Sequence, residues 1–369
     1  MLVHPDGDWH ARWCQGWPGS AHHRASRGCW GDNHRVGAHT TDASADQPAQ
    51  AENGRRSTRV PRTRAELLAN LPAPYDRQDV VLPNGTVSVR RASALNPAAA
   101  EPALFVHGLG GSAVNWTDLM SMLSDRLDSA APDLPGHGWS PPPRDGDWTP
   151  KRSAATLADL ILHLHGGRPV HLFGNSMGGA VAVQLAARRP ELVRTLTLIS
   201  PALPQRTFRR TNLHLPVVAT PGLGARLMQK YLAADPAMRA RATIDVCFAD
   251  PDSVPPQRVA EAEAEVRRRD QLPYVSDAFT QSLRGLMATY LDVSAERPWK
   301  LAERIVVPTL LVYGRQDKLV DPIAAHNKAF PDARVVTITH CGHVAQLEAP
   351  DLVSQAWREL LPHGSRTRG

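Results

Sequence analysis

One short segment constrains the fold of this chain more than any other: a serine flanked by glycines, between an apolar run and a run of small residues. Gly174-Asn175-Ser176-Met177-Gly178-Gly179 has the G-x-S-x-G pattern, in which a serine occupies a sharp turn between a strand and a helix. The sequence predicts the strand at Val170 to Phe173 and the helix at Met177 to Arg188. The glycines leave room for a strained turn that lifts the Ser176 hydroxyl above a sheet and places the Met177 N–H at a helix N-terminus. We therefore expect a nucleophilic serine; a plain glycine-rich turn is the alternative.

Predicted strands and helices alternate on both sides of this segment. A hairpin is expected where two β-rich runs, 80–82 and 86–90, flank Pro83-Asn84-Gly85, because an Asn-Gly pair favours a tight turn. Further strands are expected at 103–106, 129–133, 195–199, 309–313 and 335–338, and helices at 113–127, 156–164, 322–329 and 350–361. Such alternation predicts an α/β fold in which a mostly parallel sheet is covered by helices on both faces.

The alternation stops between residues 201 and 300, where the pattern is mostly helical and often interrupted by proline. We expect a helical lid, or cap, inserted into an α/β core whose two parts are 65–200 and 301–369. Residues 1–64 have no helical or alternating apolar period and are expected to form a disordered extension; a reading frame that starts too far upstream is another interpretation. A third is a metal site built from cysteines and histidines of this extension: Cys14, Cys29, His22, His23 and His34. Their spacings match no known zinc pattern, so no metal is expected.

Composition and charge exclude several classes of protein. The formal net charge is +6 at pH 7, but the basic residues are scattered. The run Arg267-Arg268-Arg269 follows alternating glutamates (261–265), as on a solvated helix face, so nucleic acid is not an expected partner. Four cysteines without CxxC spacing fit a reduced compartment. No apolar run approaches the ~20 residues of a membrane-spanning helix, and the first residues lack the apolar core of a secretory signal. We expect a cytoplasmic protein with a small-molecule substrate and no integral membrane segment.

A second glycine-rich segment, His107-Gly108-Leu109-Gly110-Gly111, follows the strand expected at 103–106. Acyl transfer needs two hydrogen-bond donors at the developing oxyanion, and loss of one typically costs about 10²–10³-fold in rate. We predict that the backbone N–H groups of Leu109 and Met177 form this oxyanion hole. The alternative is a loop that merely turns the chain. His107 itself is predicted to be a structural hydrogen-bonding residue.

A serine hydroxyl is a poor nucleophile without a neighbouring base, and His343 is the best candidate. It lies in Thr339-His340-Cys341-Gly342-His343, after the last predicted strand and before the final helix. A loop at this place would turn back over the edge of the sheet. His340 is the competing candidate, but the Gly342-His343 loop makes His343 the better choice.

A carboxylate should face His343, because the imidazolium formed in the reaction needs a partner that fixes its tautomer. Asp317 follows the strand predicted at 309–313. Asp321 is the alternative, but it directly precedes Pro322 and is expected to cap a helix. We therefore predict Asp317 as the acid that orients His343.

Several motifs together resemble the α/β-hydrolase fold family over residues 78 to 362, approximately. They are the His107-Gly108 loop, the Asp133-Leu-Pro-Gly-His-Gly-Trp-Ser140 turn, the GNSMGG segment, Gly314-Arg-Gln-Asp317 and Cys341-Gly-His343. The order Ser, Asp, His along the chain is also that of this family. The resemblance implies an eight-stranded sheet and a helical lid formed by the insertion. It also implies structural roles for Asp133 and His137, whereas residues 1–60 have no counterpart in the family.

Ser176 stands where epoxide hydrolases and haloalkane dehalogenases of this fold carry Asp, which leaves acyl chemistry or cleavage of a C–C bond next to a ketone. GNSMGG and residues 342–348 are similar to meta-cleavage-product hydrolases, which cut such C–C bonds, but Val344 and Leu347 stand where those enzymes tend to carry Trp. The 133–138 turn is shared with many esterases.

We therefore expect a carboxylic-ester hydrolase that acts through an acyl-enzyme and needs no cofactor. A C–C hydrolase is the alternative, and a non-catalytic binding protein of the same fold is the second alternative. Apolar residues of the predicted lid that would line an acyl pocket, or merely form the core of the lid, are Leu223, Leu227, Met228, Phe248, Phe279 and Met287.

Overall fold

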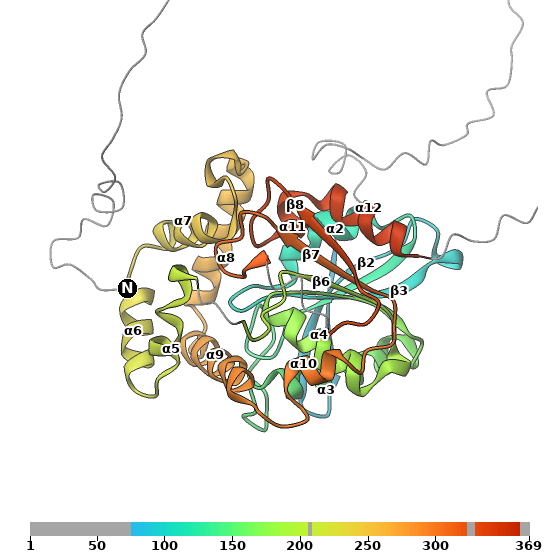
Figure 1. The fold of residues 1–369 in the computed structure, drawn as a ribbon. Helices are drawn as coiled ribbons and strands as arrows, with labels where there is room; N and C mark the ends of the chain where they lie inside the picture. The colour runs from blue at the N-terminus through green and yellow to red at the C-terminus, as the bar shows by residue number, and fades with distance from the viewer. Residues whose placement is uncertain (1–74, 206–208, 323–328, 362–369) are drawn as a thin grey trace, which may run out of the picture. The chain divides into compact units, whose positions relative to one another are not determined.

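The computed structural model describes residues 75–205, 209–322 and 329–361, and Figure 1 gives the arrangement of their helices and strands. The strands are β1 (Asp76–Leu82), β2 (Gly85–Ala92), β3 (Glu101–Val106), β4 (Leu127–Pro132), β5 (Val170–Asn175), β6 (Val193–Ile199), β7 (Thr309–Gly314) and β8 (Arg334–Ile338). They form one eight-stranded sheet in the order β1-β2-β4-β3-β5-β6-β7-β8. β2 is antiparallel to β1 and β4, whereas the remaining pairs are parallel. The predicted α/β fold with a mostly parallel sheet is therefore confirmed.

Helices cover both faces of the sheet (Figure 1). On one face α4 (Met177–Arg188) packs with α3 (Pro150–His165) and α10 (Pro298–Ala302); on the other α2 (Thr117–Met122) packs with α11 (Ala345–Glu348) and α12 (Pro350–Leu360). Each face has its own apolar cluster, and the neighbouring residues Leu172 and Phe173 of β5 contribute to different ones, because successive side chains of a strand point to opposite faces. The central strands are thus buried on both sides, which accounts for their nearly continuous apolar sequence.

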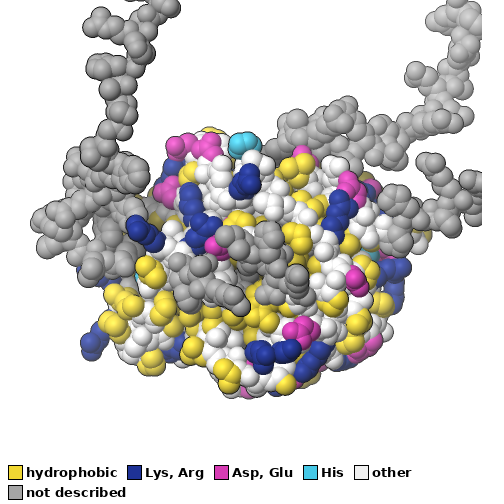
Figure 2. Space-filling view, in the orientation of Figure 1, with side chains coloured by type: hydrophobic (Ala, Val, Ile, Leu, Met, Phe, Trp, Pro, Cys, Tyr) yellow, Lys and Arg dark blue, Asp and Glu magenta, His cyan; other side chains and the backbone are white. Residues whose placement is uncertain are grey.

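The stretch predicted to be helical, 201–300, contains α5 (Leu215–Ala219), α6 (Leu223–Leu232), α7 (Pro236–Cys247), α8 (Pro256–Asp270) and α9 (Val275–Leu291). These helices gather at one side of the sheet (Figure 1). Asp235 caps α7 by accepting a hydrogen bond from the Ala237 N–H at 2.8 Å. Apolar side chains are exposed here, among them Leu213 and Val217, and Figure 2 shows apolar side chains over the part of the surface where Figure 1 places α5 and α6. The helical structure is confirmed, whereas its function as a lid stays a prediction.

One predicted helix is wrong in its extent. Residues 113–127 form a 3₁₀ turn at Ala113–Trp116 and then the short helix α2, and β4 already begins at Leu127. The apolar spacing continued across the junction because α2 and β4 bury their leucines in the same cluster, so periodicity alone could not locate the end of the helix. α3, by contrast, begins earlier than predicted, at Pro150, because the Thr149 side chain caps it by accepting from the Arg152 N–H at 3.2 Å.

None of the described helices is long and apolar enough to cross a membrane. Residues 75–205, 209–322 and 329–361 also contain no group of three or more His, Cys, Asp and Glu side chains placed to hold a metal ion. The extension predicted for 1–64, with the alternative metal ligands Cys14 and Cys29, lies outside the described residues, as does most of the helix predicted at 322–329.

Candidate active site

The turn between β5 and α4 has the geometry that its glycines predict. Ser176 has φ 54° and ψ −119°, a conformation that is strained for a residue with a side chain. A Cβ on Gly174 would lie 2.6 Å from the Gly178 carbonyl oxygen, and one on Gly179 would lie 2.7 Å from Pro201 Cβ. These positions therefore require glycine if the chain is to close the turn around Ser176.

Hydrogen bonds from two neighbouring segments hold the strained backbone of Ser176. Its carbonyl oxygen accepts from the N–H of Gly179 at 2.9 Å and from that of Ala202 at 2.8 Å, and its own N–H donates to the Ile199 carbonyl oxygen at 3.1 Å. Ile199 ends β6, and Ala202 belongs to the loop that follows. The serine is thus fixed by the adjacent strand as well as by its own helix, and it lies on the wall of a large cavity.

His343 and Asp317, from the loops after β8 and β7, form a buried pair. His343 Nδ1 lies 3.0 Å from Asp317 Oδ2 and 3.2 Å from Oδ1. Oδ1 also accepts hydrogen bonds from the N–H groups of Leu319 at 2.8 Å and Val320 at 2.9 Å. Burial raises the pKa of Asp317, but the facing His343 and these hydrogen bonds outweigh burial and hold that pKa below its ordinary value. The carboxylate is therefore ionised at neutral pH and favours the imidazole tautomer with a proton on Nδ1.

The backbone of the His343 loop is bonded to other parts of the site. The His343 N–H donates to the carbonyl oxygen of Cys247, at the end of α7, at 2.7 Å. Its carbonyl oxygen accepts from Asn175 Nδ2 at 3.0 Å, and the preceding Gly342 N–H donates to Glu348 Oε1 at 2.8 Å. Neither Asn175 nor Glu348 was expected from the sequence to take part: Asn175 lies far from His343 in the chain, and Glu348 reaches back to the loop from the end of α11.

The two competing candidates lie elsewhere. His340 is exposed. Asp321 Oδ1 lies 3.4 Å from Arg209 Nη2, and the helix that Asp321 was predicted to cap lies outside the described residues. The structure therefore brings together His343 and Asp317, the pair that the sequence favours.

The loop after β3 lies against Ser176. A Cβ on Gly108 would be 3.0 Å from Ser176 Cβ, and Leu109 lines the same cavity as Ser176 and His343. The Gly111 N–H donates to the Gly108 carbonyl oxygen at 3.0 Å, which closes residues 108–111 as a tight turn. The turn therefore presents its outer residues, Leu109 among them, next to the serine.

His107 and Asp133 support this loop through backbone hydrogen bonds. His107 Nε2 accepts from the Leu134 N–H at 2.9 Å, and its Nδ1 lies 2.8 Å from the next carbonyl oxygen along the chain. Asp133 accepts from the N–H groups of Ala113 at 2.7 Å and Trp139 at 2.8 Å. Burial lowers the pKa of His107 to about 3 and raises that of Asp133 to about 6. These contacts agree with the structural roles expected for both residues.

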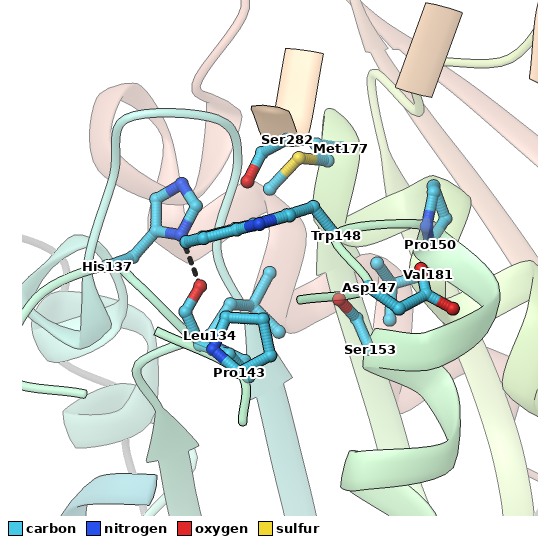
Figure 3. Close-up of a pocket in the computed structure, with 11 residues that line it drawn as sticks. Leu134, His137, Pro143, Asp147, Trp148, Pro150, Ser153, Met177, Val181 and Ser282 are labelled. Carbon is cyan, nitrogen blue, oxygen red and sulfur yellow. Dashed lines mark hydrogen bonds between the residues drawn. The ribbon is translucent and has the colours of Figure 1, made fainter. Parts of the chain in front are cut away.

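The backbone and the side chain of Met177 have different surroundings. It is the first residue of α4, so its N–H has no partner within the helix. Its side chain lies against Trp148 and Ser282, in a small cavity of about 10 Å³ that His137 also lines (Figure 3). The side chain thus packs against its neighbours, and the backbone N–H of Met177 is free of the helix to donate a hydrogen bond next to Ser176.

The serine and the imidazole share the wall of a cavity of about 820 Å³, a volume typical of small-molecule sites. Much of the remaining wall is apolar and comes from α5, α7, α8 and α9. Of the apolar lid residues considered in the sequence, three line the cavity: Phe248, Phe279 and Met287. The other three are not on its wall: Leu223, Leu227 and Met228.

The charged part of this wall was not predicted. The sequence predicts a solvated face for the arginine run of α8, and Arg267 is indeed exposed. Arg268 and Arg269 instead line the cavity. Arg268 Nη1 donates to the Gly138 carbonyl oxygen at 2.9 Å, and Arg269 Nη1 donates to the Gly110 carbonyl oxygen. Charge pattern alone did not indicate which of these side chains meet the core, and no signal in the sequence could have found them.

Comparison with known proteins agrees with the fold. A family model described as the alpha/beta hydrolase fold matches residues 102–350. The chain is 26% identical over 274 residues to Lipase 1 of Psychrobacter immobilis, which covers 71% of this chain and 78% of that protein. It is 27% identical over 272 residues to 2-hydroxy-6-oxo-6-(2'-aminophenyl)hexa-2,4-dienoic acid hydrolase of Metapseudomonas resinovorans, which covers 72% of this chain and 86% of that protein.

A further relative matches this chain over only part of its own length. The chain is 28% identical over 266 residues to the dihydrolipoyllysine-residue acetyltransferase component of the acetoin cleaving system of Cupriavidus necator. The match covers 70% of this chain but only 63% of that protein. The chain thus spans less than two thirds of the length of this relative.

Proposed function

The chain belongs to the α/β-hydrolase fold family, and from that premise we propose that it is a serine hydrolase that cleaves a carboxylic ester, or a related acyl bond, of a small and largely apolar substrate. One observation carries the proposal: the strained Ser176 and His343, from loops far apart in the chain, lie on one cavity wall, and Asp317 faces His343 from behind that wall. A strained conformation of this kind persists where the surrounding structure enforces it, and such positions cluster at functional sites.

In this proposal the three side chains have distinct roles. Ser176 is the nucleophile, His343 is the general base, and Asp317 holds the imidazole. Because Nδ1 of His343 faces Asp317 at 3.0 Å, Nε2 is the nitrogen left to accept the Ser176 proton. The ionised carboxylate then stabilises the imidazolium that forms.

The first half of the proposed reaction forms an acyl-enzyme. Nε2 of His343 takes the hydroxyl proton while Ser176 Oγ bonds to the carbonyl carbon, and the carbonyl oxygen becomes an oxyanion. The N–H groups of Leu109 and Met177 donate to this oxyanion. Collapse of the tetrahedral intermediate breaks the bond to the leaving group, which receives the proton from His343 and departs as an alcohol.

The second half uses the same groups with water. His343 takes a proton from the water, the hydroxide oxygen bonds to the acyl carbon, and the same two N–H groups hold the oxyanion. The Ser176–acyl bond then breaks, Ser176 Oγ regains the proton from His343, and the carboxylic acid leaves. His343 accepts or donates the proton in each step, and Ser176 and His343 regain their starting protonation states at the end of the catalytic cycle.

The substrate class follows from the cavity and the relatives. Its lining from α5, α7 and α9 is largely apolar, with Phe279 and Met287 among the residues on the wall. Burial of apolar surface favours an acyl group by about 0.8 kcal/mol per CH₂. A relative at 26% identity is named a lipase, which supports an ester. In this proposal the helices of 201–300 are the lid that covers the reacting bond.

A C–C hydrolase is the second candidate. A relative at 27% identity over 272 residues is named as a hydrolase of a 2-hydroxy-6-oxo-dienoic acid, and the serine segment is similar to that class. A third candidate, a non-catalytic binding protein of the same fold, is disfavoured because Ser176, Asp317 and His343 are all present. The three candidates differ in the substrate that they turn over.

The test is a panel of p-nitrophenyl esters of increasing acyl length beside a vinylogous 1,5-diketone. We expect turnover of the esters, abolished by Ser176→Ala and retained by Ser253→Ala, a matched control on an exposed turn outside the cavity. Turnover of the diketone with esters untouched would replace the ester hydrolase with the C–C hydrolase. Equal activity of wild type and Ser176→Ala would contradict both.

A further inference from the structure

The last turn of α8 contacts two loops of the core, the one after β3 and the one after β4. Arg268 Nη1 donates to the Gly138 carbonyl oxygen at 2.9 Å, and its guanidinium lies 4.3 Å from the centre of the Trp139 ring. Arg269 Nη1 donates to the carbonyl oxygen of Gly110. Gly110 lies within the 108–111 turn that carries Leu109. A helix of the predicted lid is therefore joined to the loop proposed to bind the oxyanion.

Arg269 has no carboxylate partner of its own among the described ion pairs. Its neighbour Arg268 pairs with Glu265 at 2.6 Å, and Arg267 pairs with Glu263 at 2.5 Å. Burial lowers the pKa of Arg269, although the charge of Glu265 opposes this. A partly buried guanidinium directed at a carbonyl oxygen in place of a carboxylate makes a charge-assisted hydrogen bond, which is about twice as strong as a neutral one.

Gly110 is enclosed by the lid on this side. It has φ 68°, and a Cβ built on it would lie 3.3 Å from Phe279 Cε2 of α9 and 3.9 Å from Arg269 Nη1. The 108–111 turn is closed by the Gly111 N–H at 3.0 Å from the Gly108 carbonyl oxygen. Peptide units are planar and rigid, so the Gly110 carbonyl fixes the Gly111 N–H of the same unit. That N–H donates to the Gly108 carbonyl oxygen, whose peptide unit contains the Leu109 N–H. Holding the Gly110 carbonyl therefore restricts the direction of the Leu109 N–H.

The end of α8 that carries Arg269 is itself anchored. The next residue, Asp270, accepts from Arg239 Nη1 at 2.9 Å, and Arg239 Nε donates to the Ala234 carbonyl oxygen at 3.0 Å. Arg239 is only 4% exposed. Arg269 therefore extends from a braced helix end, which makes it suited to hold a loop in place.

We propose that Arg269 is a positioning residue: from the lid, it holds the turn 108–111 so that the Leu109 N–H faces the developing oxyanion. This inference rests on the proposed serine-hydrolase function and adds a residue of the lid to the machinery of that reaction. Arg269 acts through Gly110 and does not itself touch the reacting atoms.

The experiment compares Arg269→Met and Arg269→Gln, which lose the charge and the reach to Gly110, with Arg269→Lys, which keeps a donor and a charge. Arg267→Met is the matched control, because Arg267 lies on the same turn but is exposed. Each variant is assayed with the best p-nitrophenyl ester of the panel and with the thionoester of the same acyl group. Sulfur accepts hydrogen bonds more weakly than oxygen, so a formed oxyanion hole favours the ester over the thionoester.

For Arg269→Met and Arg269→Gln we expect kcat on the ester to fall about 10- to 100-fold. One oxyanion donor contributes a rate factor of about 10²–10³, and a displaced donor loses part of this factor. KM should change little, and the ester-to-thionoester rate ratio should fall with kcat. Arg269→Lys should recover most of both, and Arg267→Met should match wild type. A residue that only anchors the lid would change KM or the thermal midpoint and leave the ratio intact.

Unchanged kcat and an unchanged ratio in the Met and Gln variants would overturn the role of Arg269 while leaving the hydrolase proposal in place. If one of these variants fails to fold, as judged by its thermal unfolding, the other decides. A wild-type protein that hydrolyses no ester would contradict the proposed ester hydrolysis, and with it the oxyanion role on which Arg269 depends.

Discussion

Replacing Asp317 by Asn isolates the tautomer of His343, because the structure determines how the new amide must lie. Oδ1 of Asp317 accepts hydrogen bonds from the Leu319 and Val320 N–H groups at 2.8 and 2.9 Å. In Asp317→Asn the amide oxygen must keep these two donors, since an amide NH₂ would oppose them. The NH₂ then occupies the place of Oδ2, which lies 3.0 Å from His343 Nδ1.

An NH₂ group in that place reverses the hydrogen bond to His343. It donates to Nδ1, so the ring proton moves to Nε2, and Nε2 can no longer accept the proton of Ser176. In a triad of this kind, the same exchange lowers kcat by about 10⁴-fold, which corresponds to about 5 kcal/mol of transition-state stabilisation. The two backbone hydrogen bonds survive, so the folded state should lose far less than this.

The assay is steady-state hydrolysis of a p-nitrophenyl ester, with the thermal midpoint as a check on folding. Asp321→Asn is the matched control, because Asp321 lies close by in the chain and is the alternative acid considered from the sequence. We expect a loss of about 10⁴-fold in kcat for Asp317→Asn and little change for Asp321→Asn. Retention of more than about a tenth of kcat by folded Asp317→Asn, or an equal loss in Asp321→Asn, would refute the reasoning.

Three further changes test particular contacts. The pKa of His107 is about 3 in the folded protein and about 6.5 when unfolded. Between these pH values the unfolded chain binds more protons, so the free energy of unfolding decreases as the pH is lowered. From pH 7 to pH 5, urea unfolding should show wild type losing about 2 kcal/mol more than His107→Gln; equal losses would contradict the neutral, buried imidazole. Gly178→Ala should lower the free energy of unfolding by about 1–3 kcal/mol, because its Cβ would lie 2.5 Å from the His107 carbonyl oxygen; an unchanged thermal midpoint would count against this close approach. Lys318→Met should cost about 1–3 kcal/mol, because Nζ donates to the carbonyl oxygens of Asp245 at 2.6 Å and Phe248 at 3.0 Å at the end of α7; a midpoint equal to that of wild type would show these bonds to be dispensable.

The parts of the fold that depend on local physics could be predicted from the sequence. The helix predicted at 177–188 has the same bounds in the structure, because a glycine-rich turn precedes it and Pro190 follows it. The hairpin around Asn84-Gly85 also forms, with Leu82 paired to Gly85. His343 and Asp317 could be placed near each other because the loops after neighbouring parallel strands meet at the same edge of a sheet.

The parts that depend on tertiary contacts could not be predicted. Leu127 fits a helical period but begins a strand, because both elements bury leucine in one cluster. Nothing in the charge pattern of α8 separates exposed Arg267 from Arg269, which contacts Gly110. The structure also decided which apolar lid residues reach the cavity, since Phe279 lines it and Met228 does not. Each of these depends on the face that one element presents to another, which sequence spacing alone leaves open.

Covalent labelling of Ser176 tests the central claim most directly. Wild type, Ser176→Ala and His343→Ala are treated with a fluorophosphonate, and peptide mass mapping locates the adduct. We predict a single phosphonyl group on the peptide that contains Ser176 in wild type, none in Ser176→Ala, and much slower labelling in His343→Ala. Folded wild-type protein that takes up no label, or that carries it on another residue, would contradict the claim that Ser176 is a nucleophile activated by His343.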